Sequence, residues 1–275
     1  MIIDDPSGLS PRAQRFLRQH CTVSASPMSI EFLQEHCAEA PDSLIERMIT
    51  FIARWDGLDL PPLPGDFYEG GVLGFSMDAR VEHRDGVGWL FDPCPGRTSV
   101  PYWYGVDEQD RFGLVCEDWV PTHPTVEAWF ESYALIHATG QMRRVTAFHG
   151  QRVQEAVDAT AAVVPDLAPI PEACGITDAW WQGGDGVLLG IFRGEAELFR
   201  RETLIAEQRQ RATAKLRNGT KADRRAARKA VRHGKAKTDQ PADQPNKDDD
   251  LGFAVVYVPQ GSPSPWAAAH PRRKE

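Results

Sequence analysis

Several features that mark other classes of protein are missing from this sequence of 275 residues. No apolar run approaches the roughly 20 residues that a helix needs to cross a bilayer, so we expect no membrane-spanning segment. The five cysteines are odd in number and widely spaced, and no two of them form a CxxC pair. This pattern argues against a dense disulfide framework and favours reduced thiols. The opening segment, MIIDDP, has no basic residue, so the sequence predicts no signal peptide and a cytoplasmic protein.

The common signatures of catalysis are absent as well. The sequence has no GxSxG, no P-loop, no HExxH and no complete Gly-rich dinucleotide loop. An unrecognised site could still lie around Ser76, His83, His123 and Asp118, but scattered histidines are more often ordinary loop or surface residues. Adjacent acids such as Glu117 and Asp118 point to opposite faces of an extended chain, which suits paired acid–base chemistry poorly. We therefore predict that the protein is not an enzyme and has no catalytic residues and no cofactor.

A repeated dipeptide raises the question of a metal site. His20-Cys21 recurs as His36-Cys37, each near the end of an expected helix. Two histidines and two cysteines could together hold zinc. Zinc modules usually space paired ligands about two to four residues apart, however, and adjacent residues on a helix point about 100° apart. We therefore expect two unrelated helix ends and no metal.

Charge is divided unevenly along the chain. Residues 1–150 contain 22 acids and 11 arginines but no lysine, a net charge of −11, whereas residues 151–275 carry a net charge of +3. The positive charge is concentrated in residues 208–237, which hold 12 basic residues and a single acid, Asp223. The acidic first part suits a basic partner, because opposite charge speeds association.

The basic stretch 208–237 admits two interpretations of equal weight. It could bind nucleic acid or another polyanion, or it could fold over the protein's own acidic part. It contains no aromatic side chain, so base stacking is not available, and binding to nucleic acid would be nonspecific and salt-sensitive. The candidate polyanion-binding residues are Arg209, Arg211, Lys215, Arg217, Lys221, Arg224, Arg225, Arg228, Lys229 and Arg232.

The best-patterned part of the chain is 99–140. It predicts a strand, an acidic turn, a second strand that is buried on both faces, a loop up to residue 124 and a helix. The helix shows one apolar stripe, with Thr125 as its N-cap and Gly140 as a left-handed end. Aromatic anchors within an acidic rim make a reasonable binding patch. The candidate partner-binding residues are Trp103, Tyr104, Asp107, Glu108, Asp110, Glu117 and Asp118.

The flanking segments predict further helices and strands. The sequence predicts helices at 10–20, 30–37 and 41–55, the last of them from its wide apolar face. Ser10 caps the first of them, and Asp42 or Ser43 can cap the third. Short strands should follow near 71–75, 81–83 and 87–91, in a sheet that the hairpin within 99–116 completes. A lone strand is unstable in water, so residues 251–258 should pair with 187–192 or with the edge of the first sheet.

These elements indicate an α+β fold with a mostly antiparallel central sheet and packed helices. We predict a first domain at 1–140. A helix, a proline-rich linker and a small strand–helix lobe should occupy 141–205. A basic and then polar low-complexity insertion, helical or disordered, should follow at 206–250, and a strand with a disordered tail at 251–275.

The segment 41–57, PDSLIERMITFIARWDG, resembles the opening of SUKH-superfamily domains, a helix that ends in Asn/Asp-Gly. Leu60-Pro61-Pro62 and Glu69-Gly70-Gly71 are similar to the central section of that family, and 126–132 looks like its terminal helix. The resemblance covers roughly residues 27–140. The sequence departs from the family in its Trp-Asp-Gly ending, where Tyr-Asn-Gly is usual, and in its long C-terminal extension. The Ala-, Arg- and Asp-rich composition also resembles that of actinobacterial proteins.

The resemblance implies a SUKH-like α+β domain without defined catalytic residues. Many such domains are immunity proteins against polymorphic toxins, and others are binding or regulatory modules. We therefore predict a non-catalytic protein-interaction module, of immunity type, that binds and masks a toxin or another protein partner. A nucleic-acid-associated protein that works through 208–237 is the alternative prediction.

Overall fold

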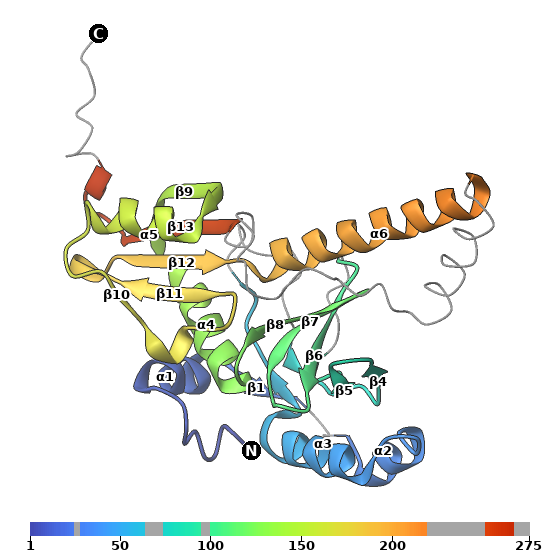
Figure 1. Ribbon diagram of the computed structural model, residues 1–275. Helices are drawn as coiled ribbons and strands as arrows, with labels where there is room; N and C mark the ends of the chain where they lie inside the picture. Colours follow the sequence, from blue (N-terminus) through green and yellow to red (C-terminus); the bar gives the residue numbers. More distant parts are fainter. Residues whose placement is uncertain (25–27, 64–73, 95–99, 219–250, 267–275) are drawn as a thin grey trace.

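The computed structural model describes residues 1–24, 28–63, 74–94, 100–218 and 251–266 (Figure 1). It shows an α+β fold in which every pair of neighbouring strands is antiparallel, as the sequence predicts. Two five-stranded sheets and one small three-stranded sheet are packed with helices. No helix of the described residues is long and apolar enough to cross a membrane.

Three helices in the first part form where the sequence predicts them. They are α1 (Pro11–His20), α2 (Ile30–His36) and α3 (Asp42–Trp55). The Ser10 hydroxyl accepts a hydrogen bond from the Ala13 N–H and caps α1, as expected. The prediction that Asp42 or Ser43 caps α3 is wrong, because Pro41 occupies the N-cap position and no side chain caps it.

The first large sheet is a meander of adjacent strands in the order β4-β5-β6-β7-β8. Its strands are β4 (Val81–Arg84), β5 (Gly88–Phe91), β6 (Trp103–Asp107), β7 (Phe112–Val115) and β8 (Trp119–His123). The small sheet contains β1 (Thr22–Val23), β2 (Leu58–Asp59) and β3 (Gly74–Phe75). Two expectations are therefore wrong. Gly74 and Phe75 pair with β2 and not with the meander, and part of the predicted loop before residue 124 is the strand β8.

The helix α4 (Val126–Thr139) lies between the two large sheets (Figure 1). Thr125 caps it as predicted, but Gly140 is right-handed, with φ −59°, so its predicted left-handed conformation is wrong. The predicted stripe, which includes Phe130, faces the first core, while Leu135 and Ile136 pack into a second core. The helix is therefore apolar on two sides, as a helix between two layers must be.

The second large sheet has the strand order β10-β11-β12-β13-β9. Its strands are β9 (Met142–Arg152), β10 (Ala168–Pro169), β11 (Ala179–Gln182), β12 (Leu188–Phe192) and β13 (Leu251–Pro259). One face packs on α4, where the Trp180 indole N–H donates to the Ser132 hydroxyl at 2.9 Å. The other face packs under α5 (Val153–Ala161). The 3-10 turns η1 (Pro171–Ala173) and η2 (Gly184–Gly186) flank β11.

The strand β13 pairs with β12 on one side and with β9 on the other. The expected pairing of 251–258 with 187–192 is thus confirmed, and the first sheet is not involved. The strands β12 and β13 are therefore adjacent in the sheet but separated in the sequence by residues 193–250, an insertion that contains a helix. We call this insertion the interruption. The predicted domain boundary near residue 140 stays a prediction, although α4, which ends just before it, packs on both sheets.

The helix α6 (Gly194–Asn218) belongs to this interruption and runs away from the sheets (Figure 1). Its first turns hold it to the body of the protein. Leu198 is fully buried in the first core, and one carboxylate oxygen of Asp178 accepts the backbone N–H groups of Arg193 and Gly194, both at 2.9 Å. The two ends of the interruption lie together, because a Cβ on Gly252 would come within 2.6 Å of Arg193 Cγ.

We expect residues 203–249 to be dispensable for folding. Replacement by a ten-residue Gly/Ser linker should change the free energy of unfolding by no more than about 1 kcal/mol, because the ends are close and Leu198 is retained. Chemical denaturation measures this. The matched variant Leu198→Ala should lose about 2–4 kcal/mol. A linker variant that is less stable than Leu198→Ala would contradict this account of the insertion.

Candidate functional site

The aromatic members of the predicted binding patch are core residues. Trp103 and Tyr104 are each 7% exposed. Tyr104 packs into the first core, where its ring centroid lies 5.2 Å from that of Phe112. Trp103 packs on the opposite face of the sheet with Trp119, and the Arg80 guanidinium lies 4.3 Å from its ring centroid. Neither side chain offers an exposed anchor to a partner.

Asp107 is also buried, with no exposed area, and it organises the turn between β6 and β7. Its carboxylate accepts the backbone N–H groups of Gln109 and Arg111 at 3.0 and 2.9 Å. It also accepts the Arg111 Nε–H at 2.7 Å and the Trp119 indole N–H at 3.3 Å. Arg47 binds its backbone carbonyl oxygen. Asp107 therefore holds the turn together and does not face solvent.

The remaining predicted acids lie at the surface, but each has a partner within the protein. Glu108 accepts the Trp89 backbone N–H at 3.0 Å, and Asp110 forms an ion pair with Arg47. The other two acids of the patch bind α6, in the pairs Glu117–Arg209 at 2.7 Å and Asp118–Arg201 at 3.3 Å. The patch that the sequence predicts is thus largely occupied by the protein's own side chains.

The described part of the basic stretch binds acids of this chain. Arg209 pairs with Glu117 on the first sheet, and Arg211 pairs with Glu207 one turn earlier on α6. The Arg209 contact favours the interpretation in which the stretch folds against the acidic first part. The structure describes the backbone but not the side chains of Lys215 and Arg217. The other candidates, Lys221, Arg224, Arg225, Arg228, Lys229 and Arg232, lie outside the described residues.

The two histidines considered for catalysis lie too far apart to act in one site. His83 lies on β4 and His123 on β8, the two edges of the meander, so four strand spacings or roughly 19 Å separate them. Burial lowers the pKa of His123 to about 3, which leaves it neutral and weakly basic at neutral pH. Burial likewise raises the pKa values of the Cys21 and Cys94 thiols, so neither is an activated thiolate.

Asp92 is a perturbed acid that the sequence does not single out. It follows β5, is 4% exposed, and accepts the Cys94 backbone N–H at 3.2 Å. Burial raises the pKa of this carboxyl to about 7, and the charge of Asp78 adds to the shift. Perturbed acids occur at active sites but also in structural positions. Asp92 does not line the described cavity, so we assign it no reaction.

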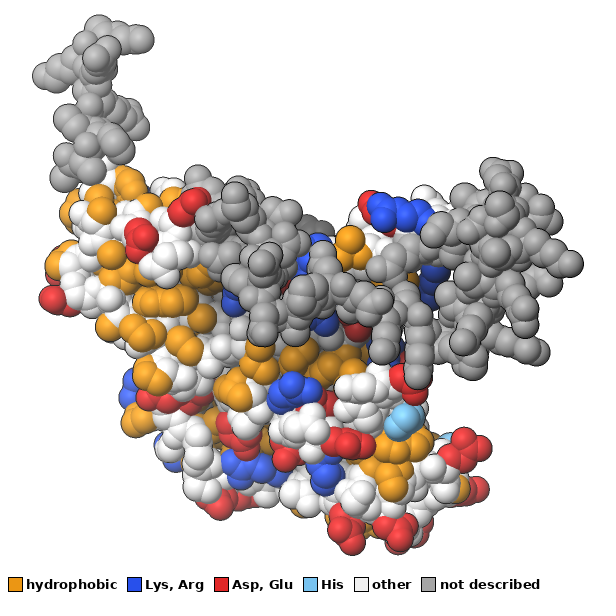
Figure 2. All heavy atoms as spheres, viewed as in Figure 1, with side chains coloured by type: hydrophobic (Ala, Val, Ile, Leu, Met, Phe, Trp, Pro, Cys, Tyr) orange, Lys and Arg blue, Asp and Glu red, His pale blue; other side chains and the backbone are white. Residues whose placement is uncertain are grey.

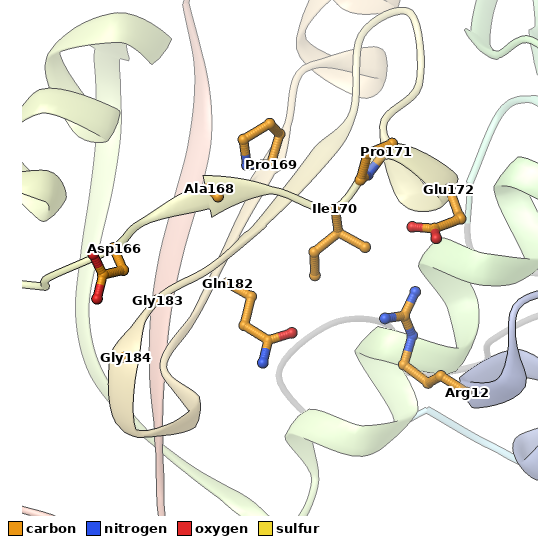
Figure 3. A pocket seen from close by; sticks show the side chains of 10 residues that line it. All are labelled: Arg12, Asp166, Ala168, Pro169, Ile170, Pro171, Glu172, Gln182, Gly183 and Gly184. Atoms are coloured by element: carbon orange, nitrogen blue, oxygen red, sulfur yellow. The ribbon is translucent and has the colours of Figure 1, made fainter.

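A cavity of about 480 Å³ lies between α1 and the β10–β11 edge of the second sheet (Figure 3). Its polar side chains include Arg12, Glu172, Gln182 and Asp166. The Arg12 guanidinium already donates to Glu131 at 3.0 Å, so it is not a free cation for an anionic ligand. Among the described residues no group of three or more His, Cys, Asp or Glu side chains could hold a metal ion.

An acidic surface that the sequence analysis missed covers α2 and the start of α3. Residues 19–46 contain five acids and neither lysine nor arginine. All five are exposed, and none forms an ion pair with a described residue. Figure 2 shows red side chains along the lower right margin, where Figure 1 places α2 and α3. We call this the α2–α3 surface, and its residues are Ile30, Glu31, Phe32, Glu35, Glu39, Asp42 and Glu46.

The helix α2 also exposes apolar side chains because it is short and anchored on one side. Its inward residues are Leu33 and the following Cys37, both buried in the first core. Ile30 and Phe32 are 43% and 44% exposed. The Phe32 ring stacks on His36 at a centroid distance of 3.7 Å. Glu31 and Glu35, one turn apart, line an adjacent side of the helix. Exposed apolar side chains thus stand beside acids without counter-charges.

Comparisons of the chain with protein-family models, with curated proteins and with solved structures found no match. The similarity to SUKH domains therefore stays a prediction. The functional argument rests on the geometry of the described residues.

Proposed function

We propose that this chain is a non-catalytic protein-interaction module that binds a basic protein partner through the α2–α3 surface. One observation carries the proposal. Five exposed acids without ion pairs among the described residues occupy α2, the turn after it and the start of α3, and α2 also exposes two apolar side chains, Ile30 and Phe32. Interfaces of this kind use apolar anchors for affinity and the charged rim for selection and speed of association.

The partner should be basic because the α2–α3 surface leaves its negative charge uncompensated. Surface acids elsewhere in the meander, such as Asp110 and Glu117, are paired with arginines of the same chain. Unpaired charge of one sign creates a potential that steers an oppositely charged partner and repels acidic competitors. A basic protein gains from both effects, whereas nucleic acid would be repelled by this surface.

The resemblance to immunity domains suggests a toxin as the partner. A toxin that cleaves nucleic acid presents a basic substrate site, and an acidic protein can cover it by charge complementarity.

Co-expression tests the proposal. The chain should be produced with the toxin encoded by a neighbouring gene, and growth should be compared with that of cells carrying the toxin alone. Protection together with a purified one-to-one complex would support the module. The absence of both protection and binding would refute the proposal. If deletion of 208–237 instead abolished retention of the protein on DNA or RNA at low salt, the alternative nucleic-acid function would replace it.

A further inference from the structure

The two large sheets have four edge strands, which differ in length and in cover. β8 contains Pro121, and its Thr122 carbonyl accepts the N–H groups of Ile176 and Thr177 at 2.7 and 3.3 Å. β10 has two residues, one of which is Pro169, and β4 has four. Proline, short length, covering loops, β-bulges and charged side chains are the usual protection of sheet edges against pairing with other chains.

The fourth edge, β9, relies for protection on two register shifts and three arginines. It has 11 residues and contains no proline. It pairs with β13 on one side, and no strand of the described residues pairs with its other side. Figure 1 shows β9 along the upper margin of the sheet, beyond β13. Alternate residues of an antiparallel strand direct their N–H and C=O groups away from the neighbouring strand. About half of the backbone groups of β9 therefore point to this edge.

The middle of β9 has a regular backbone. Register shifts interrupt its pairing with β13 at Gly252/Phe253 and at Val256/Tyr257. Between them, residues 146–149 pair in continuous register with 253–256. Thr146, Ala147 and Phe148 are half-buried, so an extended segment would meet a regular and partly apolar backbone. The faces of the sheet are already packed on α4 and α5, which leaves the edge as the open direction of growth.

The charge of β9 selects among possible occupants. Its sequence, MRRVTAFHGQR, contains three arginines and no acid, and Arg143 and Arg144 are exposed. A second copy of β9 would bring the same three positive charges to the same edge. An acidic strand would bring the opposite charge. We infer that β9 is a docking site for an extended acidic segment of another protein, which adds a strand to the second sheet.

Labelled peptides test this inference directly. The probe is a ten-residue peptide of alternating Val and Thr with two aspartates at its C-terminal end, which an antiparallel strand would place beside Arg143 and Arg144. In fluorescence anisotropy the acidic peptide should bind at least about tenfold more tightly than the same peptide with two arginines. In hydrogen exchange, its addition should protect 145–148. Equal binding of the two peptides, or protection elsewhere only, would overturn the inference.

Two adjacent proline variants locate the contact. Neighbouring N–H groups of a strand point in opposite directions, so Thr146→Pro and Ala147→Pro remove one outward group and one group that faces β13. The outward variant should stay folded and lose the acidic peptide. If the outward variant is folded and still binds the acidic peptide as tightly as the parent does, the proposed site is refuted.

The double variant Arg143→Ser/Arg144→Ser gives a readout that does not depend on the proline variants. It should weaken binding of the acidic peptide about tenfold. Unchanged binding would contradict the charge argument. If the parent protein forms a dimer and the outward proline variant abolishes it, the occupant of the edge is a second copy of this chain. That result would overturn the inference of an acidic partner. Substitutions on the α2–α3 surface should leave binding of the acidic peptide to β9 unaltered. Failure of the proposed α2–α3 interface can therefore be distinguished from failure of the β9 site.

Discussion

Replacement of Asp107 by alanine should lower the free energy of unfolding by about 3–5 kcal/mol. The carboxylate is fully buried and accepts four hydrogen bonds, one of them from the Arg111 guanidinium. Its loss would leave two backbone N–H groups and the Trp119 indole N–H without their acceptor. Chemical denaturation followed by tryptophan fluorescence measures the change.

The control for this variant is Asp110→Asn in the same turn, because asparagine tolerates the φ of +61° at this position. Asp110 is 71% exposed and pairs with Arg47 at the surface, so loss of its charge should cost no more than about 1 kcal/mol. Similar losses for the two variants would show that Asp107 is an ordinary surface acid. Our account of the turn as a structural element would then be wrong.

Replacement of Asp92 by asparagine should stabilise the protein at pH 8 by about 3–4 kcal/mol and leave its stability at pH 4 nearly unchanged. The folded protein raises the pKa of this carboxyl from 3.8 to about 7, chiefly by burial. The unfolded chain therefore releases the proton at lower pH than the folded protein does. Stability falls as pH rises from about 4 to 7, and the loss is complete above 7.

Asparagine keeps an acceptor for the Cys94 N–H and cannot ionise, so the variant should not show this loss. Unfolding free energies of parent and variant should be measured at several pH values. Other groups, including His123, titrate in both proteins, so their effects cancel in the difference. A difference that does not change between pH 4 and pH 8 would contradict the raised pKa.

The sequence predicts the elements whose patterns are local. The N-caps of α1 and α4, the apolar stripe of α4 and the hairpin of β6 and β7 all form as expected. β8 was missed because Pro121 and neighbouring polar residues obscure its strand pattern. Proline is tolerated there because β8 is an edge strand. The second buried side of α4 was missed because Leu135 and Ile136 lie off the main stripe and face a sheet built largely from later residues.

Part of the predicted binding patch is buried for a physical reason. Acids in a turn were interpreted as solvated, but Asp107 is fully buried because it satisfies donors of its own turn and of Trp119. The α2–α3 surface could have been found from the absence of lysine and arginine in residues 19–46. The exposure of Phe32 was less accessible, since it depends on how few residues of α2 reach the core.

The most direct test of the proposed function is the affinity of the purified partner for a charge-reversed α2–α3 surface. The triple variant Glu31→Lys/Glu35→Lys/Asp42→Lys should weaken binding by about 100-fold or more and slow association. A matched variant reverses three exposed acids elsewhere, Glu155→Lys/Asp158→Lys/Glu172→Lys, and should bind within about threefold of the parent. Parent-like affinity of the first variant would contradict the proposal that this surface binds the partner.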